Sequence, residues 1–354
     1  MKKIAVISFT ENGSRLAEKL REELGDRFEI TLSEKYKKAE RPVKESLSAW
    51  TKRQFQTKDG ILYVGAAGIA VRAIAPYVRG KAEDPAVLVI DEQGRYCIPI
   101  LSGHLGGANE LAVLTAKRIG AQAVITTATD LNGKWAADVF AKKNHLTVSD
   151  MKKAKEISAR LLDGERLSLY VEKSCGEIRG NLPEELYRLT DTQACGGEGM
   201  GRIPDIVIGV RKNPCWEQTL YLIPKTVTLG IGCKRGVSGA RVERSILRLL
   251  EKQGIFPESI EKIASIDLKK DEKGILFCIE KYGWEYVTYA ADELRSAEGN
   301  FQKSSFVQSV TGVDNVCERS AVCASAGGEL LARKQAADGV TVAAAVRKRS
   351  IQFE

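Results

Sequence analysis

Residues 96–120, YCIPILSGHLGGANELAVLTAKRIG, decide the fold of the region around them. Tyr96 to Leu101 form a short apolar run that predicts a buried strand. A glycine-rich turn follows at residues 102–107, and apolar side chains then recur from Ala108 to Ile119 with the spacing of one helix face. The stretch therefore predicts a strand, a turn, and a helix whose unpaired N–H groups face any ligand bound at that turn.

Apolar runs alternate with helical patterns through the neighbouring sequence. We expect strands at residues 3–8, 27–32, 61–64, 86–90 and 123–126, with helices at residues 13–24 and 69–75. This alternation predicts an α/β domain with a doubly wound, mostly parallel sheet. Ligands bind such sheets outside the carboxyl ends of the strands. We therefore expect the turns at residues 65–68, 102–107 and 127–130 to converge on one site.

The sequence pattern divides the chain into three predicted domains. Residues 1–133 form the N-terminal α/β domain, and residues 134–224 form a small α/β middle domain that includes a glycine-rich loop. Residues 225–354 form a separate α/β C-terminal domain, which opens with a strand and a second basic, glycine-rich turn. A strand at residues 341–346 is expected to close the chain.

Composition narrows the class of protein and ligand. The 354 residues carry a net charge of +8, but lysine and arginine are scattered and no aromatic ladder accompanies them. This favours a polyanionic small molecule over nucleic acid or a membrane surface. The eight cysteines form no C-x-x-C pair or zinc-binding pattern, so we expect reduced thiols and no metal site. No run approaches the roughly 20 apolar residues of a membrane span, and we expect a cytoplasmic protein.

Two titratable side chains near the first turn are the catalytic candidates. His104 is one of two histidines in the chain, and it can act as a general acid or base or only bind a carboxylate. Glu110 can orient His104, act as the base, or simply stabilise the first turn of the helix. Ser102 points the same way as His104 if the backbone there is extended. It is then conceivable as a nucleophile, although no G-x-S-x-G elbow surrounds it. The other histidine, His145, is expected at the surface.

The remaining candidates suit a carboxylate-rich ligand. Backbone N–H groups of residues 106–108 could hold an oxyanion or a substrate carboxylate. Alternatives stay open elsewhere, because Arg72 could be a solvated helix residue and Asp130 a turn former. Cys233, beside two cations, could have a lowered pKa. The substrate-binding candidates on these grounds are Gly65, Gly68, Arg72, Ser102, Gly106, Gly107, Asp130, Gly232, Lys234 and Arg235.

Residues 103–112, GHLGGANELA, together with residues 125–130, ITTATD, resemble the CbiG family of cobalt-precorrin-5A hydrolases, which act in anaerobic cobalamin biosynthesis. Residues 229–236, LGIGCKRG, are similar to the C-terminal domain of that family. Lys269 with residues 271–272, and residues 311–312 with Val316 and Glu318, extend that similarity. The resemblance covers essentially the whole chain, and it adds Gly103, Asn109, Thr127 and Glu318 to the substrate-binding candidates. For Glu318, an exposed helical glutamate is the ordinary alternative.

The resemblance implies a reaction. The family opens the δ-lactone of a ring-contracted cobalt-tetrapyrrole and releases acetaldehyde, on the way to adenosylcobalamin (vitamin B12). Cobalt then belongs to the substrate, so the protein needs no cofactor of its own. The resemblance also implies transient contact with other enzymes of the pathway. We expect the site near His104, at the carboxyl edge of the N-terminal sheet and covered by the C-terminal domain.

Two other functions remain open at this stage. One is a non-catalytic carrier that binds and hands on corrin intermediates. The other is a nucleotide-dependent oxidoreductase, because a doubly wound sheet commonly binds dinucleotides. The turn that contains Gly232 has the spacing G-x-G-x-x-x-G, which matches the dinucleotide-binding pattern poorly.

Overall fold

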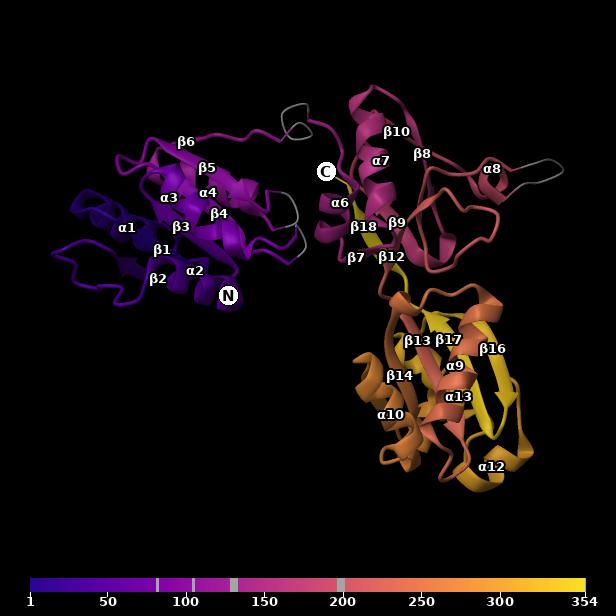
Figure 1. The fold of residues 1–354 in the computed structure, drawn as a ribbon. Coiled ribbons are helices and arrows are strands. Elements are labelled where there is room, and N and C mark those ends of the chain that lie inside the picture. The colour runs from indigo at the N-terminus through magenta and orange to yellow at the C-terminus, as the bar shows by residue number, and fades with distance from the viewer. Residues whose placement is uncertain (81–82, 104–105, 128–132, 196–200, 354) are drawn as a thin grey trace. The chain divides into compact units, whose positions relative to one another are not determined.

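The computed structural model describes residues 1–353 apart from 81–82, 104–105, 128–132 and 196–200. The chain forms two compact units, Met1–Lys134 and Trp135–Glu354. Each unit is described by itself below, with the elements labelled in Figure 1.

The first unit is built on a sheet of strand order β2-β1-β3-β4-β5-β6. Its strands are β1 (Lys2–Ser8), β2 (Phe28–Glu34), β3 (Gly60–Val64), β4 (Ala86–Ile90), β5 (Tyr96–Leu101) and β6 (Gln122–Ala123). The first four strands of the chain are mutually parallel, β5 is antiparallel to β4, and β6 is parallel to β5. The predicted α/β class with a mostly parallel sheet is confirmed.

Helices cover both faces of this sheet, as the doubly wound pattern requires (Figure 1). They are α1 (Glu11–Leu24), α2 (Leu47–Thr57), α3 (Ala67–Ile74), the short η1 (Ala75–Tyr77) and α4 (Ala108–Ile119). Apolar residues of α1 and α4 form one core with Ile4 and Val6 of β1. Those of α2 and α3 form a second core with Ala5 and Ile7, because successive side chains of a strand point to opposite faces.

The direction of β5 corrects the expected position of the first turn. Val87 of β4 pairs with Leu101 of β5, so β5 ends where β4 begins. Residues 102–103 and 106–107 of the turn consequently lie at the amino ends of β1, β3 and β4, whereas residues 65–68 follow the carboxyl end of β3. The two turns lie at opposite edges, and the prediction that they converge is wrong. The reversal arises at Gly94, whose φ of 68° closes a tight hairpin between β4 and β5.

The second unit contains a mostly parallel sheet of order β10-β8-β11-β12-β7, in which β7 is antiparallel to β12. Its strands are β7 (Leu146–Val148), β8 (Leu167–Val171), β10 (Leu186–Arg188), β11 (Ile206–Ile208) and β12 (Leu220–Pro224). Its helices are α6 (Ala137–Lys143), α7 (Met151–Leu162), η2 (Lys173–Cys175) and α8 (Asp191–Cys195). Side chains of α6 and α7 pack with those of β8, β11 and β12 in one core.

A further sheet in this unit has the order β15-β14-β13-β17-β16. Its strands are β13 (Val227–Cys233), β14 (Ile260–Ile266), β15 (Glu285–Tyr289), β16 (Glu329–Ala337) and β17 (Val340–Val346). The helices are α9 (Gly239–Gln253), η3 (Pro257–Ser259), η4 (Asp267–Lys269), α10 (Lys273–Tyr282), α11 (Ala291–Ser296), α12 (Ser305–Thr311) and α13 (Val316–Ala324). Helices α9 and α10 pack against each other, and α13 contacts β13, β14 and β17.

The chain does not close with β17. A last strand, β18 (Arg349–Gln352), pairs in parallel with β9 (Gly176–Arg179), which lies between the strands of the middle sheet in sequence. Ile351 and Phe353 are buried in the core that contains α6 and α7. The end of the chain thus returns to residues that the sequence assigned to the middle domain, and the prediction of a final strand at residues 341–346 is corrected.

Candidate functional site

The turn between β5 and α4 has a conformation that only glycine permits at two places. A side chain at Gly106 would put its Cβ 2.2 Å from the Cβ of Ser102. Gly107 has a φ of 82° and precedes the first residue of α4. The backbone therefore folds back on itself closely before the helix begins.

Ser102 is a structural member of this turn. Its φ is 58°, and its buried hydroxyl donates a hydrogen bond of 3.0 Å to the backbone oxygen of Asp84. The alternative of a serine nucleophile assumed an extended backbone at this position, and that assumption is wrong. A substrate contact by Ser102 stays a prediction.

Two backbone amides at the start of α4 are already engaged. The N–H of Ala108 donates to the oxygen of Ser102 at 3.0 Å, and the N–H of Asn109 donates to the oxygen of Gly103 at 3.0 Å. The expectation that Ala108 donates to an oxyanion is therefore corrected, because its proton closes the turn instead. Gly106 and Gly107 keep their role as predicted donors.

Asn109 ties the turn to the segment that follows β6. Its Nδ2 donates to the hydroxyl of Thr127 at 3.0 Å, and the residue is only 8% exposed. Gly103 packs against the same side chain, because a Cβ there would lie 2.8 Å from Oδ1 of Asn109. The structure thus brings together three of the predicted residues. His104 and Asp130 lie outside the described residues, and their roles stay predictions.

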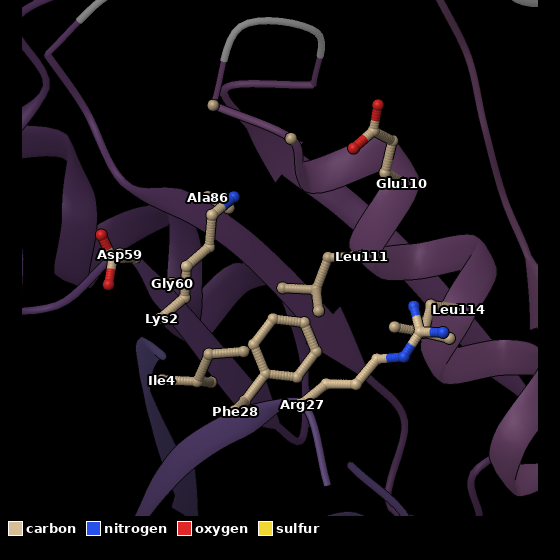
Figure 2. Close-up of a pocket in the computed structure, with 12 residues that line it drawn as sticks. Lys2, Ile4, Arg27, Phe28, Asp59, Gly60, Ala86, Glu110, Leu111 and Leu114 are labelled. Atoms are coloured by element: carbon tan, nitrogen blue, oxygen red, sulfur yellow. The ribbon is translucent and has the colours of Figure 1, made fainter. Parts of the chain in front are cut away.

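Glu110 borders a hollow beside the turn (Figure 2). The hollow has a volume of about 230 Å³ and is lined by Gly106 and Gly107, by the first turns of α4, and by the amino ends of β1 to β4. Glu110 is exposed, so its carboxylate can reach a ligand. Sequence patterns did not predict Lys2, Arg27 and Phe28 in this lining, because ligand contacts were expected at the carboxyl ends of the strands.

Gly65, Gly68 and Arg72 lie at the opposite edge of the sheet. Gly65 has a φ of 153° and approaches the ring of Phe9, and Gly68 is near the start of α3. The exposed Arg72 donates to the backbone oxygen of Gly68 at 3.4 Å, within its own helix. The structure therefore does not bring these residues to the glycine turn that precedes Glu110, and a second anion cradle here stays a prediction.

The second predicted glycine turn follows β13 and is also exposed. Lys234 and Arg235 are solvent-accessible, and the N–H of Gly236 donates to Oε1 of Glu272 at 2.8 Å. Lys269 forms an ion pair with the same Glu272, with a nitrogen-to-oxygen distance of 3.0 Å. The two exposed cations thus lie on a turn whose backbone is held in place by its hydrogen bond to Glu272.

Cys233 in this turn does not have the lowered pKa that its cationic neighbours suggested. Burial raises the pKa of its thiol, and this outweighs the opposing effect of Lys269. Gly232, next to it, is held by the hydroxyl of Thr341, which donates to the Gly232 oxygen at 3.1 Å. This environment favours a structural role for Cys233 over that of a nucleophile.

Glu318 is fully buried, which excludes the alternative of an exposed helical glutamate. Its Oε2 accepts hydrogen bonds of 2.9 Å from the N–H of Gln302 and from Nδ2 of Asn315. Its Oε1 accepts one of 2.7 Å from the N–H of Lys334. The carboxylate thus joins α13 to β16 and to the loop before α12. Direct contact with a ligand stays a prediction.

The described part of the chain contains no group of three or more histidine, cysteine, aspartate or glutamate side chains placed to hold a metal ion. Within the same residues, no helix is long and apolar enough to cross a membrane.

Comparison with known proteins assigns most of the chain to three family models. Residues 49–130 match the family model "Cobalamin synthesis G N-terminal", residues 135–224 match "Cobalamin biosynthesis central region", and residues 227–345 match "Cobalamin synthesis G C-terminus". A cobalt-precorrin-5A hydrolase of Salmonella typhimurium is 36% identical over 82% of this chain and 83% of its own length. The chain belongs to the CbiG family.

A second CbiG relative, the cobalt-precorrin-5A hydrolase of Priestia megaterium, is 30% identical over 97% of this chain and 94% of its own. Among solved structures, a cobalamin biosynthesis protein G homolog of Sulfolobus solfataricus covers 97% of both chains at 23% identity, with a TM-score of 0.40. The CbiG N-terminal model includes the turn that contains Gly106 and Gly107. It begins at residue 49, so Lys2 and Arg27 lie outside it.

Proposed function

We propose that this protein is a cobalt-precorrin-5A hydrolase of adenosylcobalamin biosynthesis, which opens the δ-lactone of a ring-contracted cobalt-tetrapyrrole with release of acetaldehyde. The observation that carries the proposal is the match to two relatives of that name over most of both chains. The exposed Glu110 beside a glycine turn and a hollow supports it, because a proton-transfer group next to backbone donors accelerates ester hydrolysis.

The proposed reaction has two steps. Water adds to the lactone carbonyl, the bond from the acyl carbon to the ring oxygen breaks, and the leaving alkoxide takes a proton. This gives a carboxylate and a free hydroxyl on the carbon that carries the methyl group. That hydroxyl then loses its proton, the carbon–carbon bond to the macrocycle breaks with its electron pair moving to the macrocycle, and acetaldehyde leaves.

The chain supplies proton transfer and charge stabilisation in this scheme. Glu110 and His104 share the tasks of removing a proton from water and returning one to the alkoxide. The N–H groups of Gly106 and Gly107 face the oxygen on which negative charge develops. One such donor typically lowers the activation barrier by about 2.7–4 kcal/mol. Gly103, Asn109 and Thr127 hold the turn in place.

Several parts of the proposal concern the surroundings of the reaction. Cobalt enters as part of the substrate, and the protein itself uses no cofactor. Lys234 and Arg235 bind peripheral carboxylates of the substrate, so their replacement by alanine should weaken substrate binding. The enzyme works in the cytoplasm and contacts other cobalamin-pathway enzymes transiently.

Acetaldehyde release from the cobalt-bound lactone tests the function. We expect release by the wild type and a loss of about two orders of magnitude or more in His104→Asn or Glu110→Gln, the usual scale for general acid–base catalysis. His145→Asn and Glu11→Gln are matched controls, because His145 is exposed and Glu11 is an exposed glutamate in the first turn of α1. A folded wild type that binds the substrate without releasing acetaldehyde would be a carrier, and the proposal would be wrong.

A further inference from the structure

The hollow beside Glu110 has an apolar floor. Ile4 of β1, Phe28 of β2, and Leu111 and Leu114 of α4 line it, and Figure 2 shows the ring of Phe28 lying between Ile4 and Leu111. Phe28 and Leu114 are only partly buried, although they pack against the core of the unit. A flat apolar ligand placed here would cover surface that water now contacts, which is favourable in proportion to the area covered.

Two cations stand at the rim of this floor. Lys2 and Arg27 are exposed, and neither has an ion-pair or hydrogen-bonding partner for its side chain among the described residues. In Figure 2 the side chain of Arg27 extends along the side of the hollow that Leu114 lines, and that of Lys2 extends along the side that Ala86 lines. By contrast, the carboxylate of Asp59 on the same rim accepts the N–H of Lys3 at 2.7 Å. The rim therefore offers unpaired positive charge on either side of an apolar surface.

The size of the hollow limits what it can hold. Sites that enclose a whole drug-sized ligand measure about 300–1,000 Å³. At about 230 Å³, this hollow has room for one edge of a tetrapyrrole and not for the whole macrocycle. The rest of such a ligand would extend past Gly106, Gly107 and Glu110, which form the opposite wall.

We infer that this hollow is a substrate subsite, in which one ring of the tetrapyrrole edge lies on Phe28 while its peripheral carboxylates pair with Lys2 and Arg27. The inference rests on the proposed function and adds specificity-determining residues that lie outside the CbiG N-terminal family model. A ligand anchored in this way presents its adjoining edge to the glycine turn. Lys2, Arg27 and Phe28 thus select and position the substrate, while Glu110 acts on it.

The two cations are tested by the double variant Lys2→Gln/Arg27→Gln. Binding of the cobalt-tetrapyrrole lactone is measured by titration, and turnover by acetaldehyde release. We expect Kd and KM to rise by about tenfold, the effect of losing about 1.4 kcal/mol of binding free energy, while kcat stays within about twofold. The control is Lys37→Gln/Lys38→Gln, which removes two exposed cations from the loop after the carboxyl end of β2.

A chemical comparison separates charge pairing from indirect effects. Esterification of the peripheral carboxylates should weaken substrate binding to the wild type, and this loss should be largely absent in the double variant, because the same pairs are already gone. Phe28→Leu should raise Kd while the thermal midpoint stays close to that of the wild type.

The inference is overturned if the double variant binds as the wild type does, if the control weakens binding as much, or if esterification affects both proteins equally. Because Kd is measured directly, a wild type that binds but does not react would defeat the proposed function while leaving the subsite intact.

Discussion

The side-chain amide of Asn109 donates to the hydroxyl of Thr127 at 3.0 Å and thereby joins the start of α4 to the segment that follows β6. Asn109 and Thr127 both lie at the edge of the sheet where β5 ends, because β6 runs parallel to β5 and Thr127 follows β6. The bond therefore fixes the position of the glycine turn relative to a second loop.

Thr127→Val should release this connection at nearly constant volume. The variant leaves the largely buried Nδ2 of Asn109 without this acceptor, and we expect a loss of about 1–3 kcal/mol in unfolding free energy. Because the turn then moves relative to Glu110, kcat should fall more than KM rises. Thr126→Val, a change at the exposed neighbouring threonine, should alter neither quantity. Equal effects of the two substitutions would exclude a positioning role for the bond.

Gly106→Ala should disable the turn directly. The new methyl group would lie 2.2 Å from the Cβ of Ser102 and 2.7 Å from the backbone oxygen of the same residue, so the backbone must shift. Displacements of about 1 Å near reacting groups can reduce rates by about 100-fold, and we expect acetaldehyde release to fall by at least that factor. Gly80→Ala is the control, because a Cβ there meets no atom of the described residues within 4 Å. Wild-type activity in Gly106→Ala would show that the turn plays no part in the reaction.

The apolar periodicity predicted most of the N-terminal fold, because local patterns determine which residues face the core. The strand at Tyr96–Leu101 and the helix at Ala108–Ile119 agree with the sequence expectation. The direction of β5 was predictable in principle. A parallel connection needs a crossover of a dozen or more residues, whereas only residues 91–95 separate β4 from β5.

Strand β16 was missed because its sequence, ELLARKQAA, has low strand propensity. Its pairing with β17 is a tertiary effect that local pattern does not reveal. The same holds for the candidate site. Motif reasoning identified Gly106, Gly107 and Glu110, but the basic rim comes from Lys2 and Arg27, which no motif connects to the turn.

The stability of the first unit should depend on pH through Glu34. Burial alone would raise the pKa of this carboxyl, but hydrogen bonds from Ser14 and Arg41 and from the backbone N–H of Glu40 lower it to about 2, below its ordinary value of 4.5. A lowered folded-state pKa stabilises the fold above pH 4.5, and this stabilisation is lost as the pH falls towards 2.

Glu34→Gln should therefore lower the unfolding free energy at pH 7. It should also make that free energy fall less steeply as the pH is lowered from 4.5 to 2. Hydrogen exchange of β1 and β2 amides at pH 7 and at pH 3 measures this. Glu29→Gln, at an exposed position of the same strand, should leave the pH dependence unchanged. A wild-type pH profile in Glu34→Gln would contradict the prediction.

The end of the chain should stabilise the sheet of order β10-β8-β11-β12-β7 and the helices packed on it, which together form the middle sheet region. Asn144 and Gln352 exchange two hydrogen bonds, from Nδ2 to the backbone oxygen at 3.0 Å and from the backbone N–H to Oδ1 at 2.7 Å. Phe353 is 1% exposed and packs its ring against Phe140, with centroids 4.4 Å apart. These contacts join β18 to α6, although about two hundred residues of chain separate them in sequence.

Phe353→Ala should consequently destabilise the second unit by about 3–5 kcal/mol, the usual cost of removing a buried phenylalanine ring. Hydrogen exchange in β9 should accelerate, because β18 is its pairing partner. Phe306→Ala removes the same ring from a position that is 74% exposed and should have little effect. If β9 remained protected in Phe353→Ala, β18 would not contribute to the stability of the fold, and the prediction would be wrong. Protection lost in β9 but kept in β13 would instead show that β18 stabilises the middle sheet region independently of the neighbouring sheet.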